Sequence, residues 1–151
     1  MIDIYSRKII GYAIGKTLSS ELTLAALQMT IATRNVKNLI HHSDQGIQYA
    51  CQAYTELLKE HGIRISMSAK GNPYENAYME SFFKTLKQEE VYLWQYESYD
   101  DVITRVSCFI EDVYNRKRLH SSLGYRPPEE YENLLAENAS QECVIAKTVN
   151  V

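Results

Sequence analysis

The chain has 151 residues, 45% of them hydrophobic and 23% charged, with a formal net charge of −3. This composition is typical of a soluble globular protein long enough for one domain with a hydrophobic core. The small negative charge argues against binding of nucleic acid through charge alone. No apolar run approaches the roughly 18 residues of a membrane span, and residues 1–7 lack the apolar stretch of a signal peptide. We therefore expect a cytoplasmic protein with no membrane partner.

The first half of the chain predicts alternating strands and helices. Residues 2–14 are rich in β-branched side chains and predict two strands joined by a tight turn near Ser6 and Arg7. Ser19 and Ser20 offer caps for a helix, and the apolar residues that follow have helical spacing. Residues 36–42 predict a short buried strand. Residues 50–61 predict a helix that Gly62 ends.

The second half begins with a half-buried strand at residues 63–68, where apolar and polar side chains alternate. Asn72 is a candidate N-cap of a helix that starts at Pro73 and reaches residue 90. Ser98 and Asp101 form a second capping pattern. The buried stripe of that helix is expected to consist of Val102, Val106, Phe109, Ile110 and Val113.

A short helix is expected to start at Pro127 and Pro128 and to end near residue 136, before a frayed tail. The pattern thus predicts an α/β domain over residues 2–136, with two later strands that could lie parallel, and a disordered tail over residues 137–151. The three cysteines contain no CxxC pair, so neither a disulfide framework nor a zinc site is predicted.

Asp44 belongs to the first motif that could carry chemistry, His-Ser-Asp-Gln-Gly-Ile-Gln-Tyr at residues 42–49. The motif places a carboxylate just past the carboxyl end of a predicted strand, which is where open α/β sheets form ligand sites. Asp and Gly are also ordinary turn residues, so the motif by itself could be only a turn. The neighbouring His42 is not expected to be a ligand.

Glu80 belongs to the second motif, on the helix predicted after Asn72. At about 100° per residue, Met79, Phe82, Phe83 and Leu86 form one stripe, which we expect to face the core. A second arc of about 80° carries a carboxylate, an amide and two lysines: Asn76, Glu80, Lys84 and Lys87. A solvated Glu80–Lys84 pair would explain this arc equally well when it is considered alone.

Taken together, the two motifs have a distinctive spacing, because residues 45–79 place thirty-five residues between Asp44 and Glu80. Residues 3–7 read Asp-Ile-Tyr-Ser-Arg and precede a predicted strand. Residues 114–127 contain Tyr-Asn-x-x-Arg-x-His-x-x-Leu-Gly-Tyr-x-Pro. In these motifs, over residues 2 to about 134, the chain resembles bacterial insertion-sequence transposases whose catalytic domain is related to retroviral integrases.

The resemblance implies a ribonuclease-H-like integrase core, a mixed sheet with helices on both faces. It implies DNA cleavage and strand transfer by a triad of two Asp and one Glu with Mg²⁺, for which Mn²⁺ can substitute. Asp44 and Glu80 would be the catalytic metal ligands in this chain. Lys84 and Lys87 would hold the DNA end of the element, and Asn76 would steady the site.

The basic segment at residues 116–120 supports two interpretations. Arg116, Arg118 and His120 could contact DNA phosphates. They could equally belong to a solvated helix end, where basic side chains complement the helix dipole.

The chain also departs from the family pattern. The first catalytic Asp would lie upstream of Asp3, so we expect that ligand, the first strand and part of the second to be absent and the triad to be incomplete. Asp3 taking over the missing role is a further possibility. An uncovered strand edge favours a homo-oligomer, or pairing with full-length transposase.

Two other functions compete with transposition and integration near the bacterial nucleoid. A truncated copy could be a non-catalytic module that binds DNA or transposase, and salt-dependent DNA binding without cleavage would favour it. A ribonuclease-H-type nuclease shares the metal chemistry, but the Asp-to-Glu spacing and residues 72–76 favour a transposase.

Overall fold

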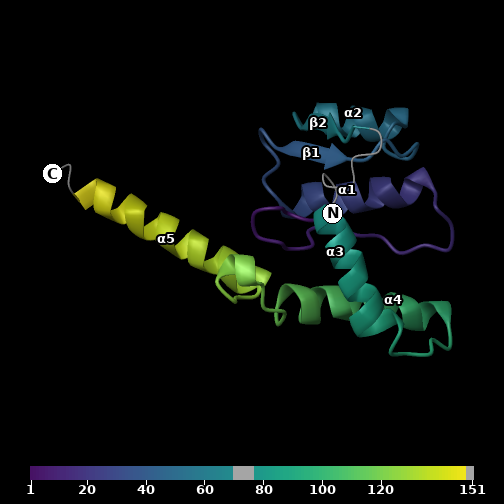
Figure 1. Ribbon diagram of the computed structural model, residues 1–151. Coiled ribbons are helices and arrows are strands. Elements are labelled where there is room, and N and C mark those ends of the chain that lie inside the picture. The colour runs from purple at the N-terminus through teal and green to yellow at the C-terminus, as the bar shows by residue number, and fades with distance from the viewer. Residues whose placement is uncertain (70–76, 149–151) are drawn as a thin grey trace. The chain divides into compact units, whose positions relative to one another are not determined.

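The computed structural model describes residues 1–69 and 77–148, with the side chains of those residues up to Ala139. The chain divides into two compact units (Figure 1). The first unit comprises Met1–Ile2 and Ile10–Glu97, and the second comprises Asp3–Ile9 and Ser98–Val151. The expected single core domain over residues 2–136 stays a prediction.

The first unit confirms the predicted alternation of helices and strands. Its elements are α1 (Ser20–Thr33), β1 (Ile40–Ser43), α2 (Gln52–Glu60), β2 (Arg64–Met67), α3 (Ala77–Leu86) and a π-helical turn, η2 (Lys87–Val91). Gly62 ends α2, as expected, and its φ of +67° is a left-handed conformation that glycine adopts without strain.

Strands β1 and β2 are parallel, in a register that pairs Ile40 with Arg64 and Ser43 with Met67. Helix α2 connects them, as a parallel pair requires. Because the two strands run in the same direction, their carboxyl ends, at Ser43 and Met67, lie at the same edge of the sheet. The α/β class expected from the sequence is therefore confirmed.

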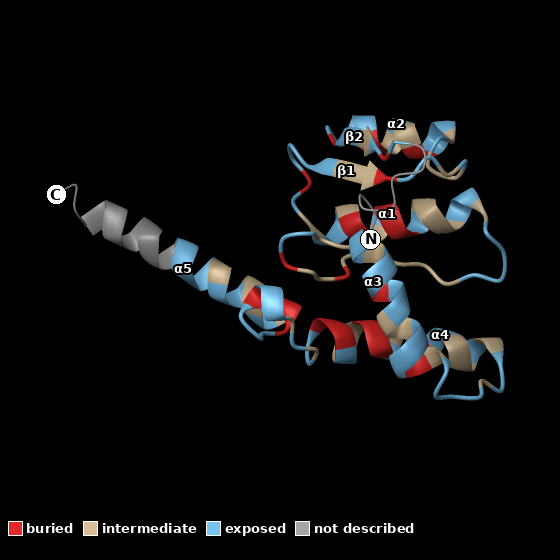
Figure 2. Ribbon diagram, in the orientation of Figure 1, coloured by how far each residue is buried: buried red, intermediate tan, exposed pale blue. Residues whose placement is uncertain are grey.

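The core of the first unit is a cluster of buried side chains from α1, α2 and the segments that lead into the two strands: Leu27, Val36, Tyr54, Leu58 and Ile63. Figure 2 shows buried positions on α1 and α2. Tyr54 has no exposed surface, and its hydroxyl lies 2.9 Å from His41 Nε2, so its one polar group is satisfied inside the core.

The strand pair expected over residues 2–14 is reduced to a hydrogen-bonded turn. Asp3 N donates to Lys8 O at 2.9 Å, and Ile10 N donates to Met1 O at 3.0 Å. These bonds enclose a turn at residues 4–6, and no extended strand forms over residues 2–14. The described strands therefore form a two-stranded parallel sheet, without the antiparallel part of the expected mixed sheet.

The buried stripe expected on α3 is only partly buried. Phe82 is 5% exposed and Met79 and Leu86 are half-buried, but Phe83 is 49% exposed. The prediction for Phe83 was therefore wrong. Phe83 lies at one edge of the stripe, where a side chain leaves the buried face first. The expected cap at Asn72 lies outside the described residues.

The second unit begins with α4 (Tyr99–Cys108) and continues through a π-helical turn, η3 (Phe109–Asn115), a 3₁₀ turn, η4 (Ser121–Leu123), and α5 (Pro128–Thr148). The predicted cap is confirmed, because Asp101 N donates to Ser98 Oγ at 3.1 Å. Of the expected stripe, Val106, Phe109 and Ile110 are buried, whereas Val113 is 36% exposed. The π-helical turn changes the spacing after Cys108 and rotates Val113 away.

Helix α5 is longer than expected, because it continues to Thr148 instead of ending near residue 136. Residues 128–148 contain neither glycine nor an internal proline to end the helix. The expected disordered tail over residues 137–151 stays a prediction.

Two distant segments meet inside the second unit. Ile9 N donates to the buried Asn115 Oδ1 at 2.9 Å, and Asn115 Nδ2 donates to Ile9 O at 3.0 Å. Ser6 Oγ donates to Glu132 Oε1 at 2.7 Å, and Lys8 lies 3.3 Å from the same carboxylate. The Asn115 amide pairs with the backbone as a neighbouring strand would.

Candidate active site

Asp44 follows directly after β1, at the carboxyl edge of the parallel pair. Its side chain is exposed, and its Oδ1 accepts a hydrogen bond from Gly46 N at 2.8 Å. This is the local bond that lets Asp start a turn. The turn interpretation of the motif is thus confirmed. It does not exclude a ligand role, because Oδ2 accepts no hydrogen bond from any described residue.

Hydrogen bonds join the ends of the two strands on both sides of Asp44. Ser68 N donates to Ser43 O at 2.9 Å, and Gln45 Nε2 donates to Ser68 O at 3.2 Å. The ring of His42 lies between two serine hydroxyls, with Nδ1 2.9 Å from Ser66 Oγ and Nε2 3.1 Å from Ser68 Oγ. The backbone that carries Asp44 is therefore fixed before and after the carboxylate.

Aromatic rings support the same edge from the core. The His41 ring contacts the rings of Tyr49 and Tyr54, with centroids 6.4 and 5.6 Å away. Burial raises the pKa of Tyr49, and the negative charge of Asp44 raises that pKa further. Burial lowers the pKa of His41 to about 4.

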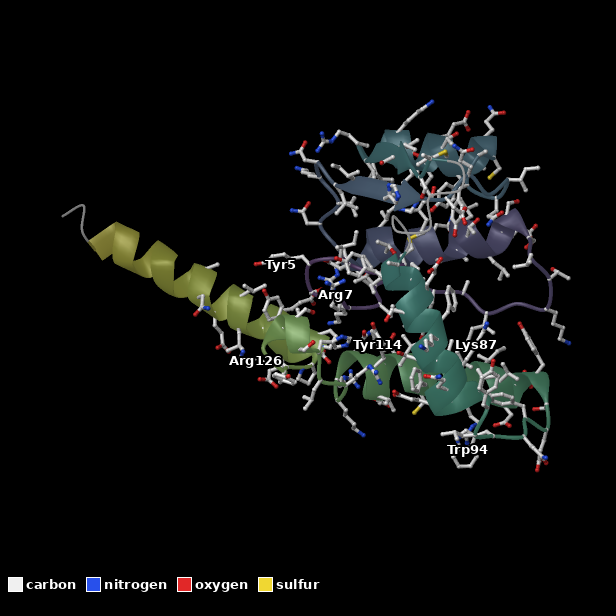
Figure 3. All side chains as sticks on the ribbon, in the orientation of Figure 1. Tyr5, Arg7, Lys87, Trp94, Tyr114 and Arg126 are labelled. Carbon is white, nitrogen blue, oxygen red and sulfur yellow. The ribbon has the colours of Figure 1, made fainter. Side chains whose placement is uncertain are left out.

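Glu80, Lys84 and Lys87 are exposed along α3 and the start of η2. At about 100° per residue the three side chains share one side of the helix. Figure 3 labels Lys87, the last of the three. Within the described residues none of the three takes part in an ion pair. The solvated Glu80–Lys84 pair considered above is thus not formed there, and one side of α3 offers an uncompensated carboxylate and two free ammonium groups.

The structure brings Asp44, Glu80, Lys84 and Lys87 into the first unit. Asn76, the remaining member of the expected site, lies outside the described residues. The basic positions at residues 116–120 belong to the second unit.

Arg116 is already engaged by two acidic side chains. Its Nη1 lies 2.6 Å from Asp112 Oδ1, and its Nε lies 2.9 Å from Glu129 Oε2. Contact between Arg116 and a DNA phosphate would require breaking or sharing these ion pairs. The arrangement favours the interpretation of Arg116 as part of a charged helix end.

His120 is held differently. Its ring lies edge-on to Tyr114, with centroids 5.2 Å apart, and its buried Nε2 has no hydrogen-bond partner among the described residues. Burial lowers the pKa of His120, and the positive charges of Arg118 and Arg7 lower it further. The ring is therefore neutral at pH 7 and could offer a hydrogen bond, but not a charge, to a phosphate.

Comparison with known proteins identifies the family. The chain matches the integrase core domain over residues 1–73 and again over residues 61–128. It is 39% identical over 132 residues to the transposase for insertion sequence element IS904 of Lactococcus lactis, covering 87% of this chain and 52% of that protein. The chain belongs to the integrase-core family of insertion-sequence transposases.

Two further relatives agree. This integrase-core chain is 41% identical over 139 residues to the 31 kDa protein of insertion element IS600 of Shigella sonnei, covering 89% of the chain and 51% of that protein. It is 41% identical over 134 residues to transposase InsF for insertion sequence IS3A of Escherichia coli K12, covering 88% and 46%. The chain thus spans about half the length of the curated relatives that it matches.

The donors of this integrase core fit a hard divalent cation in type. Asp44 and Glu80 offer carboxylate oxygens, and Mg²⁺ is commonly held by one or two carboxylates together with waters and substrate phosphates. Within residues 1–69 and 77–148, no group of three or more His, Cys, Asp or Glu side chains is placed to hold a metal.

Asp3 is committed to a local turn in the integrase-core chain. Its Oδ1 accepts hydrogen bonds from Tyr5 N at 2.8 Å and from Ser6 N at 3.2 Å. These bonds explain Asp3 without a metal. Asp3 also belongs to the second unit, whereas Asp44 and Glu80 belong to the first.

The serines that support Asp44 were not predicted from the sequence. Ser66 and Ser68 alternate with Ile65 and Met67, so they project from one face of β2. The alternation in the sequence already indicated the common face of the serines, but their partner, His42, became evident only from the strand register.

Among the described helices of this integrase core, none is both long and apolar enough to cross a membrane.

Proposed function

We propose that this chain is part of the catalytic core for DNA transposition, in which Asp44 and Glu80 bind the divalent metal that drives phosphoryl transfer. The observation that carries the proposal is the placement of Asp44. It is an exposed carboxylate at the carboxyl edge of the parallel pair, fixed on both sides, and thirty-five residues separate it from Glu80 in an integrase core. Relatives described as transposases support the same activity.

The division of roles follows from the chemistry of the side chains. Mg²⁺, or Mn²⁺ in its place, would activate the attacking oxygen and stabilise the leaving oxygen of the phosphodiester. Asp44 and Glu80 supply hard oxygen ligands to that metal. Only these two carboxylates of the expected triad can be assigned in this chain, so we do not expect strand transfer by this chain alone.

DNA is the proposed partner, including the ends of the element and its target. Lys84 and Lys87 lie one and two turns beyond Glu80 on the same side of α3, where their free charges could neutralise phosphates near the metal. Arg118 and His120 are proposed secondary DNA contacts, as is Arg116 once released from its carboxylates. Asn76 is proposed to steady the site from the turn before Glu80.

Manganese titration by calorimetry tests the metal site. We expect Asp44→Asn and Glu80→Gln each to weaken Mn²⁺ binding by at least about tenfold, since each removes a charged ligand. Asp3→Asn is the matched control, because its side-chain oxygen can still accept the two local hydrogen bonds. The Mn²⁺ affinity of Asp3→Asn should equal that of the native chain.

Two outcomes would overturn this assignment. Weakened binding in Asp3→Asn would make Asp3 a ligand. Absence of binding in the native chain would favour the second candidate, a non-catalytic module that binds DNA or transposase. Salt-dependent DNA binding that Lys84→Gln weakens, without metal-dependent cleavage, is the expected signature of that module.

A further inference from the structure

The side chain of His42 lies on the face of the sheet opposite to that of His41. In the parallel register His42 pairs with Ser66, and the alternation of β2 brings Ser68 to the same face. Both nitrogens of the ring are used there, one at 2.9 Å from Ser66 Oγ and the other at 3.1 Å from Ser68 Oγ. His42 therefore joins two successive serines across the strand pair.

Ser68 passes this connection on to the backbone around Asp44. Its N–H donates to Ser43 O at 2.9 Å, and its hydroxyl lies 3.3 Å from the same carbonyl oxygen. Its own carbonyl accepts from Gln45 Nε2 at 3.2 Å. Residues immediately before and after Asp44 are thus bonded to Ser68, one of the two serines that His42 contacts.

The directions of these hydrogen bonds follow from counting protons. A serine hydroxyl has one proton, and that of Ser68 is donated to Ser43 O. Ser68 Oγ must therefore accept from His42 Nε2–H. In the neutral ring Nδ1 then accepts from Ser66 Oγ–H, which gives one continuous chain of donors from Ser66 through His42 and Ser68 to Ser43 O.

We propose that His42 is a positioning residue for Asp44, acting through Ser68, and not a metal ligand itself. The proposal rests on the proposed function, because it assumes that Asp44 binds the metal. The described sheet has only two strands, so its terminal ladder bond between Ser68 and Ser43 has no further strand beside it. His42 fastens that end and so holds the turn that presents the carboxylate.

Metal affinity gives the first test. We expect His42→Phe, which keeps an aromatic ring but breaks both hydrogen bonds, to weaken Mn²⁺ binding by about tenfold or more, as the loss of a supporting group near a metal does. His42→Gln should stay within about threefold of the native chain, because its amide can still donate to Ser68. His61→Phe, at an exposed histidine remote from this network, should leave the affinity unchanged.

A double-mutant cycle separates positioning from general loss of structure. Ser68→Ala should weaken Mn²⁺ binding about as much as His42→Phe, and the two changes together should be no worse than either one alone. Additive losses would mean that the two side chains act independently, and they would overturn the proposal. Retained binding in His42→Phe, with binding lost in Asp44→Asn, would also overturn it while leaving the proposed function intact.

Amide hydrogen exchange tests the same inference without metal. Gly46 N–H is bonded to Asp44 Oδ1, so its exchange rate reports whether the turn is held. We expect about tenfold faster exchange in His42→Phe and a near-native rate in His42→Gln. The core amide of Ile63, bonded to Leu58 O, should be unaffected in both variants. Equal acceleration at Gly46 and Ile63 would show loosening of the whole unit and would overturn the proposal, even if the chain binds no metal.

Discussion

Gly46 shows how closely the turn after β1 is fitted around the Asp44 carboxylate. A Cβ atom at this position would lie 2.8 Å from Asp44 Oδ1 and 2.7 Å from Gln48 Nε2. The Gln48 amide is the far end of a flexible side chain and can move away. Asp44 has a short side chain, so its carboxylate can move away only by rotating, which breaks its hydrogen bond to Gly46 N–H.

Gly46→Ala is therefore expected to weaken Mn²⁺ binding several-fold while changing the melting temperature little. Gly62→Ala is the matched control: it should cost about 1 kcal/mol of stability, because φ is positive there, and leave metal affinity unchanged. Calorimetry and thermal unfolding of the two variants distinguish the effects. Native affinity in Gly46→Ala would show that the turn does not control the carboxylate.

His41 gives the first unit a dependence of stability on pH. Burial holds its pKa at about 4, below the ordinary value of 6.5. The unfolded chain therefore binds a proton more readily than the folded chain between these values. The contribution of His41 to stability is complete above pH 6.5 and falls as the pH drops toward 4.

We expect the free energy of unfolding to fall by about 1–3 kcal/mol over this pH range. The lower figure applies if water reaches part of the His41 ring in the folded chain. Urea unfolding at pH 7 and at pH 4.5 measures it. In His41→Gln, whose amide oxygen can still accept from the Tyr54 hydroxyl, this part of the pH dependence should disappear. An unchanged pH dependence in the variant would assign the effect to other groups.

At the scale of the secondary-structure elements, α4 begins at a side-chain cap. Ser98 caps it through Asp101 N–H. Ser98→Ala should lower the free energy of unfolding by about 1 kcal/mol, and Ser98→Asp should retain it, since a carboxylate caps equally well and favours the positive end of the helix. Urea unfolding measures both variants, and an unchanged free energy of unfolding in Ser98→Ala would show that the cap contributes nothing.

The elements that could be predicted are those whose signal is local. The Ser98 cap, the glycine after α2 and the alternation in β2 are readable from neighbouring residues, and α4, α2 and β2 formed within a few residues of their expected places. Ser19 precedes α1 as expected, but its side chain makes no capping hydrogen bond. The lack of extended strands beside the turn at residues 3–9 and the π-helical segments could not be predicted, because they depend on what lies beside them. Asn115, for example, supplies hydrogen bonds that a strand would otherwise give to Ile9.

The candidate site divides in the same way. Asp44, Glu80 and the two lysines follow from motif and spacing, which survive in the linear sequence. The support from His42, Ser66 and Ser68 depends on the register of two strands that are 24 residues apart, and no local pattern specifies it. The ion pairs that engage Arg116 are likewise tertiary, since one of its two partners, Glu129, is 13 residues away.

At the scale of the whole molecule, the sheet has uncovered edges. Among the described residues β1 pairs only with β2, and Ile40 at its start is 56% exposed. Unpaired strand edges favour association, and a lysine on an edge strand opposes it. We therefore expect the chain to self-associate or to bind a longer transposase.

Sedimentation velocity over a range of concentrations measures this association. Ile40→Lys should shift the population toward monomer. Ile47→Lys is the matched control, because Ile47 is 87% exposed but lies outside the strands, and it should sediment as the native chain does. A native chain that is a monodisperse monomer and melts cooperatively would contradict the expectation.

The pairing of Ile9 with Asn115 sets an order of events during synthesis. The two residues are separated by 106 positions, so the turn at residues 3–9 leaves the ribosome long before its partners in the second unit exist. At about 5–20 residues per second, it waits on the order of ten seconds with the apolar Ile9 uncovered. The first unit can form its core during that interval, whereas the second can close only after the last helix has been translated.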